Sequence, residues 1–203
     1  MNRNGEKPAT LGGKASNAEL VAEVGYQNVV GQDDLTRFDK KKRRNNNGNN
    51  RNNGITIQGS NVLLENCELE NSGCAFNVGA MLNWKEGPAP YNVMIRNAKI
   101  TECVIGIQCC YLSTQGKALD TRPIRKIVID NAAISKISAA ALRICNVDGA
   151  LFNGIVFKDV SRAATIDNSG NLNFTNCKID ATDLTMSDLR LERTTEDSIE
   201  GAY

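Results

Sequence analysis

The sequence contains no histidine, few aromatic residues and no long apolar stretch. Its 203 residues include 0 His, and aromatic side chains make up 5% of the composition. The chain therefore lacks the commonest general base, which excludes every serine–histidine or cysteine–histidine catalytic pair. Because no apolar run reaches about 18 residues, we expect no transmembrane helix and no membrane partner. The opening MNRNGEKPATLGGK lacks the apolar core of a signal peptide, which predicts a protein that is cytoplasmic at synthesis.

Charge and cysteine content also exclude several classes of protein. The formal net charge is +1, so the molecule as a whole is not expected to bind polyanions. The chain has 7 cysteines, an odd number, with no C-x-x-C pair among them. Without a signal peptide, this pattern argues against a disulfide framework. We expect reduced, mostly buried thiols that pack as small apolar side chains, with no metal site and no cofactor.

What the chain does contain is a short phrase that it repeats. In each copy apolar residues alternate, an Asn and a small residue follow, and the apolar pattern then resumes. The copies are VLLENCEL (62–69), VMIRNAKI (93–100), IVIDNAAI (127–134), GALFNGIV (149–156) and LNFTNCKI (172–179). Aligned on the Asn, they recur at intervals of 31, 34, 22 and 23 residues. A unit that recurs at such intervals is typical of a solenoid.

Each copy predicts a half-buried strand that bends at the Asn, because apolar residues occupy every second position and Asn favours turns. The aligned Asn residues can then hydrogen-bond to one another from coil to coil. This predicted structural Asn ladder consists of Asn66, Asn97, Asn131, Asn153 and Asn176. The alignment places two further sets in the core: Leu64, Ile95, Ile129, Leu151 and Phe174 before the Asn, and Leu69, Ile100, Ile134, Val156 and Ile179 after it.

Two segments, GITIQGSNVLLENCELENSGCAF (54–76) and IRKIVIDNAAISKISAAALRI (124–144), resemble the repeats of right-handed pectin-lyase-like β-helices. The resemblance implies an all-β fold: a single-stranded right-handed parallel β-helix of about five coils over residues 54–186, at ~4.8 Å per coil. That fold carries lyases, hydrolases, epimerases, adhesins and phage spikes and fibres, so it does not select an activity. The calcium-and-arginine signature of the pectate lyases matches no position here, and we predict no catalytic residue.

The regions outside the repeats differ in composition. Residues 1–39 read as an N-terminal anchor or tail with a short helix at AELVAEV (18–24). Residues 40–53 contain six basic residues and seven Asn, which predicts a disordered linker. The alternative for 40–51 is weak, sequence-nonspecific contact with nucleic acid. The polar stretch 187–203 is expected to form a C-terminal cap or tail.

The two longest repeats carry their extra residues at the same place, in segments 78–91 and 109–123. Stacked coils would bring both loops to one flank, which in solenoids is often the binding face. Aromatic rings beside basic groups suit sugar recognition. The predicted glycan-binding residues are Trp84, Lys85, Tyr91, Tyr111, Lys117 and Arg122. The alternative is that the Trp and Tyr rings cover the sides of the coil or pack against another subunit.

These observations favour a non-enzymatic structural or adhesive protein: a virion-associated fibre, spike or decoration component that binds a polysaccharide. Its open sheet edges predict a homo-oligomer, with a trimer favoured, or a larger assembly joined through the N-terminal segment. Two alternatives stay open. One is a carbohydrate-active enzyme, either a polysaccharide lyase or a glycoside hydrolase, or its binding fragment. The other is an intracellular scaffold that polymerises through its ends.

Overall fold

The structure is a computed structural model that describes residues 52–81, 87–113 and 119–202. The anchor predicted over 1–39, its short helix and nearly all of the linker predicted over 40–53 lie outside the described residues. Within the described part no α-helix is present, and no helix is long and apolar enough to cross a membrane. This part of the chain is all-β, with short 3₁₀ turns η3 (Met186–Asp188) and η4 (Glu196–Ser198) near its end.

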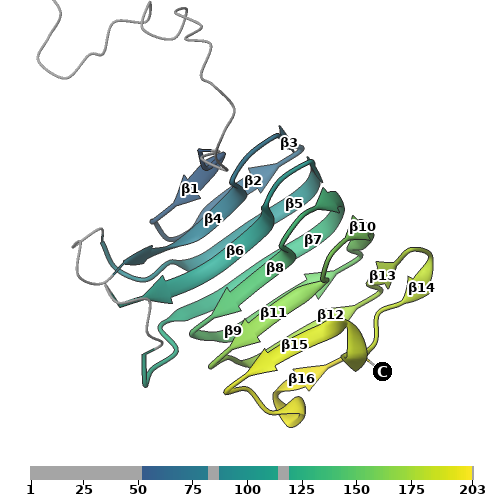
Figure 1. The fold of residues 1–203 in the computed structure, drawn as a ribbon. Helices are drawn as coiled ribbons and strands as arrows, with labels where there is room; N and C mark the ends of the chain where they lie inside the picture. Colours follow the sequence, from purple (N-terminus) through teal and green to yellow (C-terminus); the bar gives the residue numbers. More distant parts are fainter. Residues whose placement is uncertain (1–51, 82–86, 114–118, 203) are drawn as a thin grey trace, which may run out of the picture. The chain divides into compact units, whose positions relative to one another are not determined.

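The chain passes alternately through two sheets (Figure 1). The 6-stranded sheet, here sheet A, has the order β1-β4-β6-β8-β11-β15. Its strands are β1 (Ile55–Ile57), β4 (Cys74–Met81), β6 (Ile105–Leu112), β8 (Ala140–Cys145), β11 (Ala164–Asp167) and β15 (Leu189–Glu192). Every neighbouring pair in sheet A is parallel. Each strand therefore lies beside the strand that the chain formed one circuit earlier.

The 10-stranded sheet, here sheet B, takes up the chain between successive strands of sheet A. Its longer strands are β5 (Tyr91–Thr101), β7 (Ile124–Ile137), β9 (Val147–Asn153), β10 (Val156–Val160) and β12 (Gly170–Thr175). Its shorter strands are β2 (Val62–Glu65), β3 (Glu68–Glu70), β13 (Lys178–Ile179), β14 (Thr182–Asp183) and β16 (Ile199–Glu200). All pairs are parallel except the antiparallel β13–β14 pair. Two largely parallel sheets visited in alternation are consistent with a β-solenoid-like fold.

The core lies between the two sheets and follows from the period-two alternation. Along β7 the residues alternate between buried and more exposed positions on either side of its bends. In-register pairing then stacks like on like: Val93, Ile127, Ala150 and Leu172 form one buried row of sheet B. Because each strand repeats the same pattern, the rows add up to a single continuous apolar core.

The repeated Asn marks a bend in the left-handed region of backbone space, which Asn tolerates better than most residues. The φ angles are 56° at Asn66, 54° at Asn97, 55° at Asn131 and 53° at Asn176. The side-chain amide of Asn97 donates to the Oδ1 of Asn66 at 3.2 Å, and that of Asn131 donates to Asn97 at 2.7 Å. These bonds join three successive coils at the same corner.

The fourth copy is shifted by one residue from the alignment on Asn153. Strand pairing places Asn153 beside Asp130 and Thr175, one position before the bend. Gly154 occupies the bend instead, with φ of 63°. Asn153 still bridges the coils, because it donates to Asp130 Oδ1 at 2.7 Å and accepts from the amide of Asn176 at 3.1 Å. The alignment on Asn153 was therefore wrong by one position.

A one-residue shift moves every side chain of a strand to the other face. Leu151 and Val156, which the alignment placed in the core, are 38% and 47% exposed. Phe152 and Phe157 are buried in their place. The ring of Phe152 stacks on that of Phe174 with their centroids 4.7 Å apart. At these two positions the core residue is thus a phenylalanine, and the neighbouring Leu151 and Val156 face outward.

The stretch 187–203, expected as a cap or tail, contributes another pair of strands. β15 pairs in parallel with β11, and β16 pairs in parallel with β12. Leu189, Ile199 and Ala202 are buried in the same core. Regular pairing therefore extends well beyond the predicted end of the repeats at residue 186.

All seven cysteines are free thiols. Cys67 is half-buried and the other six are buried. Burial disfavours the charged thiolate and raises the pKa of Cys109 to about 12. Burial likewise raises the pKa of Cys74 to about 12, so both of these thiols are protonated at neutral pH. Most of the seven side chains are buried and pack as small apolar groups.

Candidate functional site: an open groove beside Tyr91

An open groove of about 690 Å³ lies on sheet B, where the chain enters the sheet from the long connections. Tyr91, Arg125 and Asp148 are in-register neighbours on β5, β7 and β9. The next position of each strand has a positive φ, 54° at Lys126 and 90° at Gly149. Because the backbone bends there, the residues before the bend do not follow the inward–outward alternation of the rest of the strand. The side chains before the bend therefore line a shared surface.

Tyr91 provides the aromatic face of the groove. It is 40% exposed, and the Nζ of Lys126 lies 5.1 Å from the centroid of its ring. A cation at this distance from an aromatic ring is attracted by the ring quadrupole, with a contribution of about 0.5–1 kcal/mol when exposed. The contact holds the ammonium group over the face of the ring without burying either.

A charged pair forms another part of the wall. The Nε of Arg125 lies 3.7 Å from Asp148 Oδ2, with the two side chains 61% and 32% exposed. Such an exposed pair contributes at most about 1 kcal/mol, so a ligand can displace it at little cost. The amide of Asn171 donates to Asp148 Oδ1 at 2.6 Å and fixes the orientation of the carboxylate.

The floor of the groove is partly apolar. Val128 and Leu151 point outward from adjacent strands and line it. Leu151 is 38% exposed because of the register of its strand. An apolar floor, one aromatic face and a rim of amide, guanidinium, ammonium and carboxylate groups can hold a ligand with apolar faces and hydroxyl edges.

The two long connections leave and return on neighbouring strands. β4 pairs with β6, and β5 pairs with β7. The connections that follow β4 and β6 therefore begin on adjacent strands and end beside the row of Tyr91 and Arg125. The residues 82–86 and 114–118 within them lie outside the described part of the chain. The loops are shorter than the predicted segments 78–91 and 109–123, because the first residues of those segments belong to β4 and β6.

The six predicted glycan-binding residues have different positions. Trp84, Lys85 and Lys117 lie outside the described residues. Tyr91 lines the groove. Tyr111 is 7% exposed and belongs to the core, so its ring is not available to a ligand. Arg122 is half-buried with its guanidinium group against the backbone of Gly170, and it does not line the groove.

Three of the groove's polar residues were missed by sequence reasoning: Arg125, Lys126 and Asp148. A signal for them existed. Tyr91 precedes the bend residue Asn97 by the same interval as Arg125 precedes Asn131, so both could have been assigned to one row. Asp148 joins this row only when the fourth copy is aligned on Gly154.

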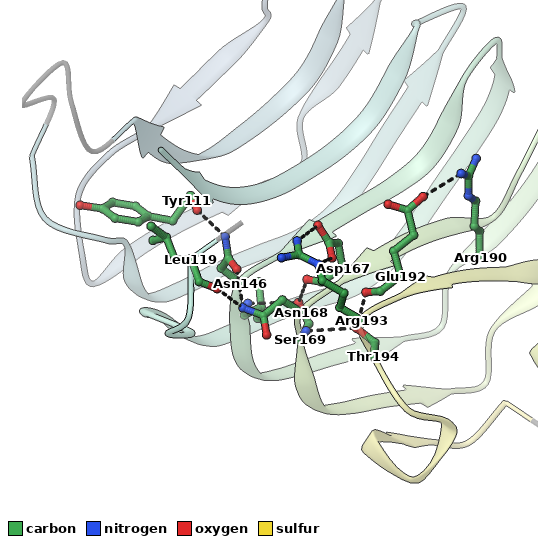
Figure 2. A network of polar contacts seen from close by, with 11 residues as sticks. Tyr111, Leu119, Asn146, Asp167, Asn168, Ser169, Arg190, Glu192, Arg193 and Thr194 are labelled. Carbon is green, nitrogen blue, oxygen red and sulfur yellow. Dashed lines mark hydrogen bonds and ion pairs between the residues drawn. The ribbon is translucent and has the colours of Figure 1, made fainter. Parts of the chain in front are cut away.

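A second polar cluster lies at the carboxyl ends of the sheet A strands, where the chain turns toward sheet B (Figure 2). The buried amide of Asn146 donates to the carbonyl oxygen of Tyr111 at 2.7 Å, and the amide of Asn168 lies 2.7 Å from Asn146 Oδ1. Arg193 forms a bidentate pair with Asp167. Among the described residues no buried side-chain nitrogen or oxygen lacks a partner. The buried amides of this cluster are therefore satisfied within the protein and support the corner.

The described residues contain no group of three or more His, Cys, Asp or Glu side chains that could hold a metal ion. Comparison of the chain with protein-family models, with curated proteins and with solved structures found no match. The groove must therefore be interpreted from its own chemistry.

Proposed function

We propose that residues 54–202 form a single-stranded right-handed parallel β-helix of the pectin-lyase-like type. The passage of the chain between two parallel sheets supports this fold, as do the hydrogen bonds between the side-chain amides of Asn residues at successive bends. The right-handed sense is supported by the general rule that parallel crossover connections are right-handed in about 98% of cases.

The proposed function of this β-helix is non-enzymatic glycan binding by a structural or adhesive protein. One observation carries it: an open groove that combines the exposed ring of Tyr91 with Lys126, Arg125 and an apolar floor. Its volume of about 690 Å³ is within the usual range of ligand sites. A sugar ring can stack its apolar face on the tyrosine while its hydroxyl groups bond to the charged and amide rim.

Binding is favoured over cleavage by the acidic content of the groove. Asp148 is the one carboxylate among the described residues that line it, and Arg125 and Asn171 already engage it. Glycoside hydrolases typically place two carboxylates about 5–9.5 Å apart on either side of the scissile bond. The described wall of the groove offers no such pair.

The test is a glycan array probed with the full chain, followed by affinity measurement on any hit. Tyr91→Ala should weaken binding at least tenfold, because it removes the stacking face. Leu63→Ala is the matched control: it removes another exposed apolar side chain of sheet B, 54% exposed, that does not line the groove. Equal affinity of the Tyr91 variant and the wild type would refute the proposal. Release of new sugar ends would favour the enzyme alternative instead.

The proposal extends to assembly as a virion-associated fibre, spike or decoration component, with a homotrimer as the favoured state. Exposed apolar surface on the outer face of sheet B, such as Val156, supports contact with other copies. Native mass spectrometry and sedimentation of the full chain test it. A compact trimer supports the proposal, a monomer at all concentrations contradicts it, and filaments favour the polymerising scaffold.

A further inference from the structure

Two cysteines lie side by side on the outer face of sheet A. Cys110 of β6 and Cys145 of β8 are direct in-register partners in a parallel pair. Both are absent from the apolar core, whereas Cys109 and Tyr111 on either side of Cys110 belong to it. The alternation of the strand thus directs the thiol of Cys110 away from the core, toward the same outer face as that of Cys145.

One member of the pair, Cys110, borders a hollow that is separate from the proposed glycan groove. Cys110 lines a space of about 450 Å³ together with Gln108, Asn77 and Thr56 on the outer face of sheet A. Cys110 and Cys145 are 4% and 5% exposed, respectively. A small molecule can approach through the hollow, although a bulky reagent would be hindered. Both thiols are therefore buried, and a route of entry to the pair exists at Cys110.

The surroundings favour a thiolate at one member of the pair. The Cys110 thiol, which donates to the carbonyl oxygen of Arg143 at 3.7 Å, lies beside the sulfur of Cys145, and the guanidinium of Arg143 acts on that same sulfur. Together they lower the pKa of Cys145 despite its burial. The pKa of Cys110 is raised by burial and by its neighbour. The nearest carboxylate in the row, Asp167, is neutralised by Arg193 and opposes the thiolate less than a free carboxylate would.

The backbone spacing is compatible with a covalent link. Neighbouring strands lie about 4.7–4.9 Å apart, and disulfides join residues whose Cα atoms are about 4.4–6.8 Å apart. We infer that Cys110 and Cys145 form a thiol-modification site, which peroxide-class oxidants convert into a disulfide between β6 and β8. This inference concerns sheet A and does not depend on the proposed glycan binding.

The reaction consumes one hydrogen peroxide for each pair of thiols. The Cys145 thiolate attacks one peroxide oxygen, forming an S–O bond as the O–O bond breaks and hydroxide leaves. The hydroxide takes up the proton that Cys145 released when it ionised and becomes the first water. The Cys110 sulfur then attacks the sulfenic sulfur of Cys145, forming the S–S bond, while the S–O bond breaks and its oxygen leaves as the second water with the Cys110 proton. The two thiols lose two electrons and the peroxide gains them.

The product would add a covalent link between coils that already share backbone hydrogen bonds, packing and side-chain bonds such as that from Arg143 to Gln108 Oε1 at 3.3 Å. It would enclose the connection between β6 and β8, which includes the second long insertion. Cross-linking constrains the unfolded chain, so the oxidised protein should unfold at a higher denaturant concentration than the reduced protein. Reduction by dithiothreitol should reverse the change.

The experiment treats the folded full chain with hydrogen peroxide, blocks the remaining thiols by alkylation after denaturation, and digests it with trypsin. Two of the seven thiols should escape alkylation. The tryptic peptides 100–117 and 144–158 should appear joined, because cleavage is expected after Lys99, Lys117, Arg143 and Lys158. Fragmentation should place the link at Cys110 and not at Cys103 or Cys109.

Cysteine variants, compared with the wild type, distinguish the possible outcomes of the peroxide treatment. Cys110→Ala and Cys145→Ala should each abolish the joined peptide, whereas Cys67→Ala, which removes the half-buried thiol, should leave it unchanged. Peptide mapping of the wild type stands even if a variant folds poorly. Full alkylation of all seven thiols after peroxide treatment would overturn the inference, as would a link through Cys103 or Cys109.

Discussion

The side-chain nitrogen of Asn153 lies 2.7 Å from Oδ1 of Asp130 and donates a hydrogen bond to it. Asn153 also accepts a bond from Asn176 at 3.1 Å. Gly154 occupies the bend between these coils and has no side chain that could form the link. Asn153 therefore links these coils from one position earlier in the strand, through Asp130 in place of Asn131.

Substitutions at Gly154 test this arrangement directly. Its φ of 63° disfavours residues with a Cβ atom, although Asn tolerates it. A Cβ atom there would meet Asn131 at 3.7 Å, an ordinary contact, so space is not the obstacle. Gly154→Ala should lower the free energy of unfolding by about 1–2 kcal/mol. Gly154→Asn should lower it by less than about 0.5 kcal/mol, the usual range of surface substitutions. Urea denaturation measures both, and equal losses would contradict the role of the bend.

The faces of the fourth copy can be assigned by truncating adjacent residues. Phe152 is fully buried against Phe174, so Phe152→Ala should cost about 3–5 kcal/mol of unfolding free energy. Leu151→Ala removes an exposed side chain and should change stability by no more than about 0.5 kcal/mol. The same denaturation experiment compares them. A larger loss of stability in Leu151→Ala than in Phe152→Ala would instead support the register in which Asn153 forms the bend.

Asn146 combines backbone and side-chain roles that two substitutions can separate. It is fully buried with φ of 59°, and its amide satisfies the carbonyl oxygen of Tyr111. Asn146→Gly keeps the permitted φ but leaves that carbonyl unpaired, which should cost about 1–3 kcal/mol. Asn146→Ala adds the backbone strain, about 1–2 kcal/mol more. If the alanine variant proved as stable as the glycine variant in calorimetry, backbone strain would have no part in the effect.

Alkaline pH should destabilise the protein through its buried thiols. Burial raises the pKa of Cys109 to about 12 in the folded state, above the ordinary thiol value of about 8.5 in the unfolded chain. The folded state thus holds the proton more tightly, and this contribution is full below pH ~8.5 and is lost as pH rises toward 12. The loss for one thiol cannot exceed about 1.4 kcal/mol per pH unit.

Cys74, whose pKa burial also raises to about 12, should contribute in the same direction. Denaturation between pH 8 and 11 should therefore show a decline that is shallower in Cys109→Ala than in the wild type. The comparison concerns slopes, because the alanine variant also loses packing at every pH. Identical slopes would show that Cys109 does not contribute to the decline.

Part of the candidate site could be predicted from the sequence. Tyr91 was predicted from its place in an insertion beside basic residues, and it lines the groove. Tyr111 satisfied the same criterion but is buried. Insertion position alone does not distinguish these residues, because the direction of a side chain depends on its place in the strand alternation. Arg125, Lys126 and Asp148 could be assigned to the groove only once the strands were paired.

The sequence by itself determined the all-β class, the recurrence of the coil and the bends at Asn66, Asn97, Asn131 and Asn176, because apolar alternation and turn residues act locally. The tertiary structure decided which of two adjacent turn-forming residues takes the fourth bend. Both Asn153 and Gly154 suit a turn, but pairing with the neighbouring coils buries Phe152 and Phe157 only when Gly154 occupies it. The same pairing placed Asp148 beside Arg125 and extended the sheets through 187–202. Register is a relation between strands, so it becomes defined only when the coils stack.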